Sequence, residues 1–71
     1  MKEFVVIFEE ADDNYSASVP DLPGCIAAGN TLEETEILIK EAIDLYIETL
    51  KQDNQTIPEP STQAKPVSIS I

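Results

Sequence analysis

The chain has 71 residues with 14 acidic side chains, four lysines, no arginine and no histidine, so its formal charge at pH 7 is −10. This length supports one domain at most, which we take to be residues 1–71. The charge repels nucleic acid and anionic membranes, and no apolar run is long enough to span a bilayer. A basic protein partner would complement such a surface, although acidity more often serves only solubility. One cysteine and no leader sequence indicate a cytoplasmic protein.

The composition also argues against catalysis. Without histidine, the usual general acid–base at neutral pH is missing. Cys25 has no arginine, histidine or nearby lysine in the sequence to lower its pKa and make it a nucleophile. The run at residues 12–14 lacks the ligand spacing of a calcium loop, and there is no glycine-rich phosphate loop. We therefore expect no enzyme, with no catalytic residue, metal site or cofactor.

Two strands are predicted at the start of the chain. Residues 2–10 are rich in β-branched and aromatic side chains and are apolar on both faces, with Val5 and Ile7 opposite the aromatic side chains. Residues 10–14 favour a hairpin turn, and residues 15–19 alternate between apolar side chains and serine. A strand that is apolar on both faces is normally covered on both.

The stretch "VPDLPGC" at residues 19–25 concentrates two prolines, a glycine and the single cysteine. Pro20 cannot donate to a sheet ladder, Pro23 presets φ for a tight turn, and Gly24 accepts positive φ at no steric cost. A reactive-cysteine loop is the less favoured interpretation. We expect a rigid turn, followed by a short strand over 25–28 in which the cysteine is a small buried side chain. The turn residues are Pro20, Asp21, Pro23 and Gly24.

A long helix is predicted from Thr31 to about Leu50. Thr31 and Glu34 match the capping box, in which each side chain satisfies a free backbone amide of the other residue. Apolar positions then recur at helical spacing over an arc of roughly 200°, more than one sheet face needs. Ile37 stands apart from this arc and is expected to be exposed.

The remainder of the chain is predicted to be an extended connection and a last strand. Residues 52–66 are polar and contain prolines without any periodicity, whereas residues 67–71 alternate between apolar side chains and serine. The fold class is therefore α+β in the order β-β-β-α-β, with one helix on one sheet face. Three strands would be antiparallel, and the C-terminal strand would lie parallel to the first, which would be central.

This architecture leaves apolar surface without a cover. One helix covers one face of the sheet, yet the first strand and the wide helix arc offer more. The last strand would also present a free edge. We therefore expect a homo-oligomer or an obligate partner. The candidate interface residues are Val5, Ile7, Leu38, Leu45, Val67, Ile69 and Ile71.

The stretch "DDNYSASVPDLPGCIAAGNTLEETEILIKEAIDLYIETL" resembles the antitoxins of the HicB family, and "PEPS" at 58–61 is also typical of them. Asn14 replaces the usual turn glycine of the family, and Thr35-Glu36 replace an apolar pair at the helix start. The matching residues are Pro20, Asp21, Leu22, Pro23, Gly24, Cys25, Gly29, Thr31, Glu33, Glu34, Ile39, Lys40, Glu41, Ala42, Ile43, Leu45 and Tyr46.

The resemblance implies a partial ribonuclease-H-like unit without nuclease activity, which neutralises a HicA-type toxin, a small basic protein that cuts messenger RNA. An acidic antitoxin suits such a partner. Many family members add a C-terminal DNA-binding domain; residues 1–71 contain none, so no direct nucleic-acid binding is expected. The alternative is a stand-alone oligomeric HicB-like protein of unassigned role, which could bind a small ligand.

Overall fold

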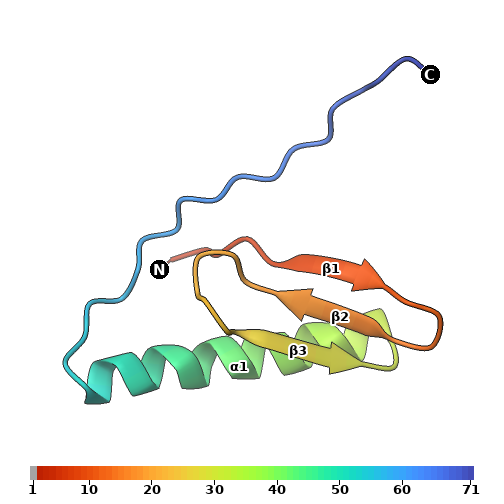
Figure 1. Cartoon of the computed structure of the whole chain (residues 1–71). Helices are drawn as coiled ribbons and strands as arrows, with labels where there is room; N and C mark the ends of the chain where they lie inside the picture. The colour runs from red at the N-terminus through yellow and green to blue at the C-terminus, as the bar shows by residue number, and fades with distance from the viewer. Residues whose placement is uncertain (1) are drawn as a thin grey trace.

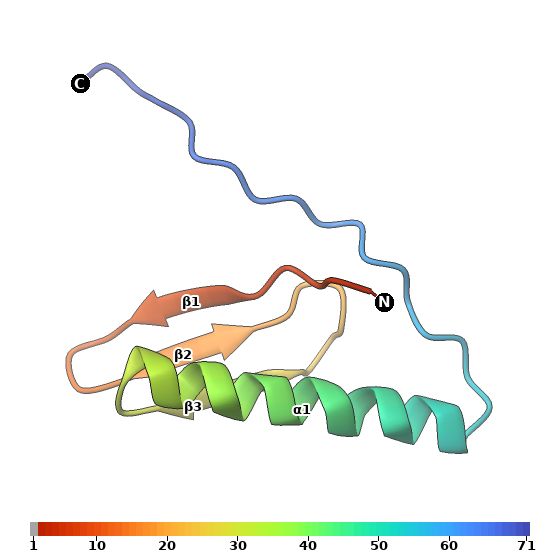
Figure 2. The same ribbon diagram turned by 180° about the vertical axis from the view of Figure 1, so that it is seen from behind.

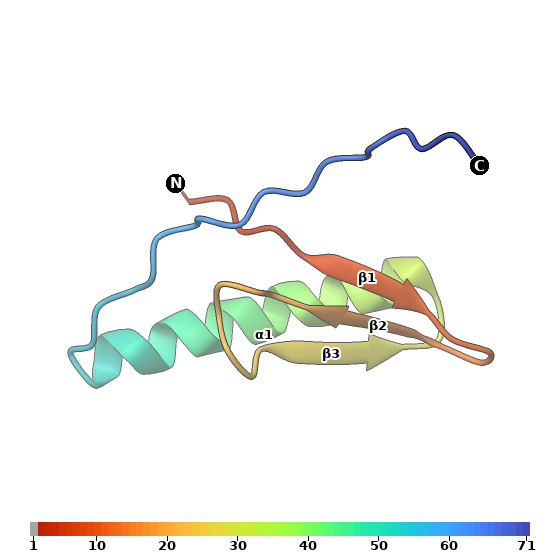
Figure 3. The ribbon, with the colours of Figure 1, turned by 45° about the horizontal axis from the view of Figure 1, so that its top comes forward.

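Three short antiparallel strands and one long helix form the body of the molecule (Figure 1). The computed structural model describes residues 2–71, which contain β1 (Ile7–Glu10), β2 (Tyr15–Ser18), β3 (Ile26–Gly29) and α1 (Leu32–Gln52). The sheet has the order β1-β2-β3, and both neighbouring pairs are antiparallel. Helix α1 covers one face of this sheet, as the views in Figures 2 and 3 also show. The predicted α+β class and the order of the first four elements are confirmed.

The register of the strands decides which side chains face the helix. Ala17 of β2 lies between Phe8 of β1 and Ala27 of β3, and all three pack into the core under α1. Because side chains alternate along a strand, the neighbouring positions face away from the helix. The fully buried apolar side chains are Ala17, Val19, Leu22, Cys25 and Ile39.

The residues at both ends of helix α1 favour its start and its end at these positions. Thr31 is the N-cap residue, and Lys51 in the last turn suits the negative end of the helix dipole. At the other end Asn54 has φ +57°, a left-handed conformation that asparagine tolerates better than most residues. The amide of Gln55 then donates to the carbonyl of Leu50 at 2.9 Å. Within residues 2–71, this helix is not apolar enough over any long window to cross a membrane.

The fourth strand that the sequence predicts is not formed in this structure. Residues 53–71 contain neither helix nor strand, and residues 63–71 are exposed and lead away from the body. Consequently β2, not the first strand, is central, and β1 (7–10, shorter than the predicted 2–10) is an edge strand.

The anchoring of the C-terminal segment gives a physical reason for this difference. Lys2 forms an ion pair with Glu59, 57 positions later in the chain. Two extended segments advance by about the same 3.3 Å per residue. Keeping that offset in a parallel pair would place Val67 beside Glu10, the last residue of β1, so residues 68–71 would lie beyond the end of the strand. The residues that would lie beside the strand instead include Pro66, which cannot donate a ladder hydrogen bond.

Candidate partner-binding surface

The turn between β2 and β3 is held by its own backbone. The amide of Leu22 donates to the carbonyl of Val19 at 3.0 Å, and the amide of Cys25 donates to the carbonyl of Leu22 at 3.0 Å. Leu22 is completely buried, and Gly24 has φ +81°, which residues with a side chain rarely adopt. This turn is therefore a structural element that fixes the path of the chain into β3.

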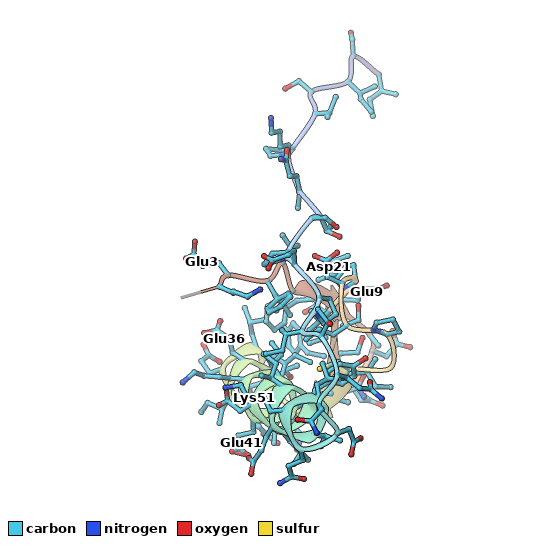
Figure 4. The ribbon with its side chains drawn as sticks, turned by 90° about the vertical axis from the view of Figure 1, so that its left-hand side faces the viewer. Glu3, Glu9, Asp21, Glu36, Glu41 and Lys51 are labelled. Carbon is cyan, nitrogen blue, oxygen red and sulfur yellow. The ribbon has the colours of Figure 1, made fainter. Side chains whose placement is uncertain are left out.

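The same turn anchors the C-terminal segment through Asp21, which Figure 4 places beside the point where that segment crosses the body. Its carboxylate accepts hydrogen bonds from the amides of Ser61 and Thr62, both at 3.1 Å. It also accepts from their hydroxyls, at 3.0 and 2.9 Å respectively. The bond from the Thr62 amide is the main cause that lowers the pKa of Asp21 below its ordinary value of 3.8, and the other three bonds act in the same direction against some desolvation. We call this set of bonds the Asp21 clamp.

The start of α1 packs directly against the end of β3. Thr31 Oγ1 accepts a hydrogen bond from the amide of Glu34 at 3.1 Å, and the buried Thr35 donates its hydroxyl to the carbonyl of Thr31 at 2.7 Å. A β-carbon at position 29 would lie 2.7 Å from Thr35 Oγ1, closer than real side chains come. Gly29 therefore allows the helix to start where it does, and the polar residue at position 35 has its hydroxyl satisfied locally.

Cys25 lies inside the core and is not exposed to a substrate. It is a free cysteine with 4% of its surface exposed, and desolvation raises the pKa of its thiol above the ordinary value. A neutral buried thiol is a poor nucleophile. Across residues 2–71, the cysteine and carboxylate side chains do not gather into any group of three that could hold a metal ion.

An apolar groove of about 310 Å³ lies between β3 and the second half of α1. At its edge stand two large side chains that face solvent, Ile26 with 70% and Leu45 with 66% of their surfaces exposed. We call it the β3 groove. Its lining includes Cys25, Ile26, Ala42, Leu45, Tyr46 and Leu50.

A second groove, of about 580 Å³, lies between the β1 edge and the other flank of α1. Phe4, Val6 and Phe8 line it from the sheet side, and all three are only half-buried although they pack on the core. Its rim carries two positive and two negative side chains. We call it the β1 groove. Its other lining residues are Ile37, Ile39, Ile43, Lys2, Glu36, Lys40 and Asp44.

The structure distributes the seven predicted interface residues over three separate places. Ile7 lies on the open sheet face in one cross-strand row with Ser18 and Ile26, and half-buried Val5 precedes it on the chain. Leu45 lies at the β3 groove, and Leu38, two helical turns earlier, is half-buried. The other three, Val67, Ile69 and Ile71, lie in the exposed C-terminal segment.

Two features of these surfaces were missed by sequence reasoning. Ile26 was assigned simply to a short strand, but in the folded chain it is 70% exposed and lines the β3 groove together with Leu45. The Asp21 clamp joins residues 40 and 41 positions apart, for which the sequence carries no periodic signal. The pairing of Asp21 with a Ser-Thr dipeptide is visible only once the chain is folded.

Negative charge surrounds the apolar surfaces. Glu41 projects from the side of α1 that faces away from the sheet, Glu36 from the flank of α1 at the β1 groove, and Glu9 from the opposite, open side of the sheet (Figure 4). All 14 acidic residues lie between positions 3 and 59, and residues 60–71 carry a lysine and no acidic side chain. The body is therefore acidic and carries exposed apolar edges, and exposed apolar patches with a polar border are typical of protein-interaction sites.

The family is shown by comparison with known proteins. Residues 4–68 match the model of the HicB-like antitoxin of bacterial toxin–antitoxin systems, and the chain belongs to this family. A UPF0150 protein of Thermoplasma acidophilum is 46% identical over 63 residues, which cover 89% of this chain and 91% of that protein. A UPF0150 protein of Synechocystis is 42% identical over 67 residues, covering 94% and 85% respectively.

Two further proteins widen the comparison. An uncharacterized 14.9 kDa protein from the rep–hol intergenic region of Haemophilus phage HP1 is 41% identical over 56 residues. The match covers 79% of this chain but only 42% of the phage protein. Among solved structures, a chain of the HicA3 and HicB3 toxin–antitoxin complex superposes with a TM-score of 0.70 at 25% identity. That match covers 84% of this chain and 70% of the other.

Proposed function

We propose that this protein is a cytoplasmic, non-catalytic antitoxin that binds and neutralises a small basic HicA-type toxin. The observation that carries this proposal is the superposition of 84% of the chain on a chain from a HicA3 and HicB3 toxin–antitoxin complex. Membership of the HicB-like antitoxin family supports the same role. The formal charge of −10 suits a basic partner, because complementary charges speed encounter and disfavour wrong partners.

We place the toxin at the β3 groove. Ile26 and Leu45 are the most exposed large apolar side chains of the folded body, and they stand side by side at this groove. Buried apolar side chains at the centre of an interface usually carry most of its binding energy, inside a polar rim. Here exposed Glu48, one helical turn after Leu45, supplies negative charge to such a rim.

The test is co-expression with the short basic protein encoded next to this chain. The neighbour alone should arrest growth, and this protein should restore growth and co-purify with it. Leu45→Glu should weaken the purified complex at least about tenfold, which corresponds to about 1.4 kcal/mol. Leu32→Glu is the matched control, because it adds the same charge to an exposed leucine of the same helix outside the groove.

Two results would overturn these assignments. A neighbour that is harmless alone, or that never binds this chain, removes the antitoxin role and leaves a stand-alone HicB-like protein. Equal weakening by Leu45→Glu and Leu32→Glu would instead remove the β3 groove as the toxin site while leaving the role intact.

We also infer that the protein self-associates. The exposed apolar side chains of the open sheet face, the helix flank and the C-terminal segment support this inference.

A further inference from the structure

The C-terminal segment has the pattern of a strand but lies apart from the sheet. Val67, Ile69 and Ile71 alternate with two serines, so an extended chain places all three apolar side chains on one face. Val67 and Ile69 are 77% and 75% exposed, respectively. Exposed β-branched residues with this alternation are suited to the edge of a sheet.

The β1 edge of the same chain is out of register with this segment. The Lys2–Glu59 ion pair and the Asp21 clamp hold the chain on the body as far as Thr62. From there an extended chain with the same offset leaves only Val67 beside the last residue of β1 and carries residues 68–71 past the end of the strand. Figures 1 and 2 both show the segment running in the direction of β1 while it diverges from it.

The β1 groove has the shape and chemistry to receive such a strand. It is open along an edge strand, and Phe4, Val6 and Phe8 offer half-buried apolar surface along it. Lys2 and Lys40 balance Glu36 and Asp44 on its rim, which makes it locally neutral on a strongly acidic body. Residues 60–71 carry no acidic side chain, so the body does not repel them.

We propose that two copies of this chain exchange their C-terminal segments, so that residues 67–71 of each copy pair with the β1 edge of the other and place Val67, Ile69 and Ile71 in its β1 groove. Residues 63–71 span roughly 30 Å when extended, enough to reach a second body without forcing the two acidic surfaces together. The exchange is reciprocal, so it closes as a symmetric dimer. This inference gives a mechanism for the proposed self-association and does not depend on the toxin role.

The experiment compares Ile69→Asp with Ser70→Asp in the full-length chain. Both place the same charge in the same exposed segment, but only position 69 faces the groove. Light scattering after gel filtration should give a dimer for the wild type and for Ser70→Asp, and a monomer for Ile69→Asp at the same micromolar concentration. Hydrogen exchange should show protected β1 amides in the two dimers and faster exchange in the monomer.

Three outcomes would overturn the exchange. A monomeric wild type with protected β1 amides means that each segment docks on its own chain. A monomeric wild type with unprotected β1 amides means that the segment docks nowhere. A dimer that survives Ile69→Asp uses another surface.

The stability of the monomer itself should be similar for both variants, because position 69 lies outside the core. The urea midpoint measures this stability at a protein concentration at which both variants are monomeric. Toxin binding should be unchanged in Ile69→Asp and at least about tenfold weaker in Leu45→Glu, which separates this proposal from the antitoxin role.

Discussion

Gly29, the last residue of β3, packs against Thr35 in the first turns of α1, and the contact leaves no room for a side chain at position 29. A β-carbon there would lie 2.7 Å from Thr35 Oγ1 and 3.0 Å from the Thr35 amide nitrogen. Thr35 cannot move easily, because it is completely buried and its hydroxyl is bonded to the carbonyl of Thr31. The small residue and the buried threonine are therefore a coupled pair.

We expect Gly29→Ala to lower the free energy of unfolding by about 1–3 kcal/mol, the usual cost of overpacking. Thr35→Ala removes one of the two close atoms, so Gly29→Ala should cost less in that background. Urea denaturation of the four proteins of the cycle gives the coupling, which should exceed about 0.5 kcal/mol. Purely additive costs would mean that the contact with the hydroxyl does not limit position 29.

The residue scale also shows which roles the sequence could convey. Glycine, proline and threonine have strong local backbone preferences. The turn at Pro20–Gly24 and the helix start at Thr31 could therefore be predicted from the sequence. Asp21 also belongs to that turn, but its carboxylate is used by Ser61 and Thr62. Such a partner 40 positions away depends on the folded path of the chain and has no local signature.

At the scale of elements, local periodicity predicted the second and third strands and the helix to within two residues, whereas the first strand, predicted over 2–10, forms only over 7–10. The prediction was wrong in pairing a fourth strand with the first one in the same chain. Alternation specifies that residues 67–71 can pair, but it does not specify with which edge. The edge also depends on where the segment is anchored on the body, here at Lys2–Glu59 and the Asp21 clamp, and no pattern within residues 67–71 contains that information.

The Asp21 clamp should depend on pH with a known sign. Its pKa in the folded chain lies below 3.8, chiefly because the Thr62 amide bonds the charged form. The four bonds are therefore fully present above pH 3.8 and are lost as the pH falls through the lower folded pKa. The NMR shifts of the Ser61 and Thr62 amide protons should titrate together with a midpoint below 3.8.

Asp21→Asn should abolish that titration and increase the mobility of residues 57–71 in heteronuclear relaxation, because an amide group offers one acceptor oxygen in place of two. Asp13→Asn, in the exposed hairpin turn, changes the charge equally and should leave both observations unaltered. A normal Asp21 titration midpoint, or an unchanged segment in Asp21→Asn, would contradict the clamp.

At the scale of the whole molecule, the acidic charge of the body acts differently on the two proposed partners, a second copy of this chain and a basic toxin. The acidic residues are confined to positions 3–59, and residues 60–71 of the C-terminal segment carry none. A second copy therefore meets a body of like charge, whereas a basic toxin meets one of opposite charge. The two proposed associations should respond oppositely to salt.

Raising the salt concentration should strengthen self-association and slow toxin association. Exposed charges are screened beyond about 10 Å at 0.1 M salt, so repulsion between two acidic bodies weakens, and so does the attraction that steers a basic protein toward one of them. Between 0.05 and 0.5 M sodium chloride, sedimentation should give a lower dimer dissociation constant, and stopped-flow mixing with the toxin should give a lower association rate. The toxin dissociation rate should change much less, because the apolar contacts proposed at Ile26 and Leu45 are not screened. A dimer that weakens with salt would mean that complementary charges, not the apolar exchanged segments, hold the two copies together.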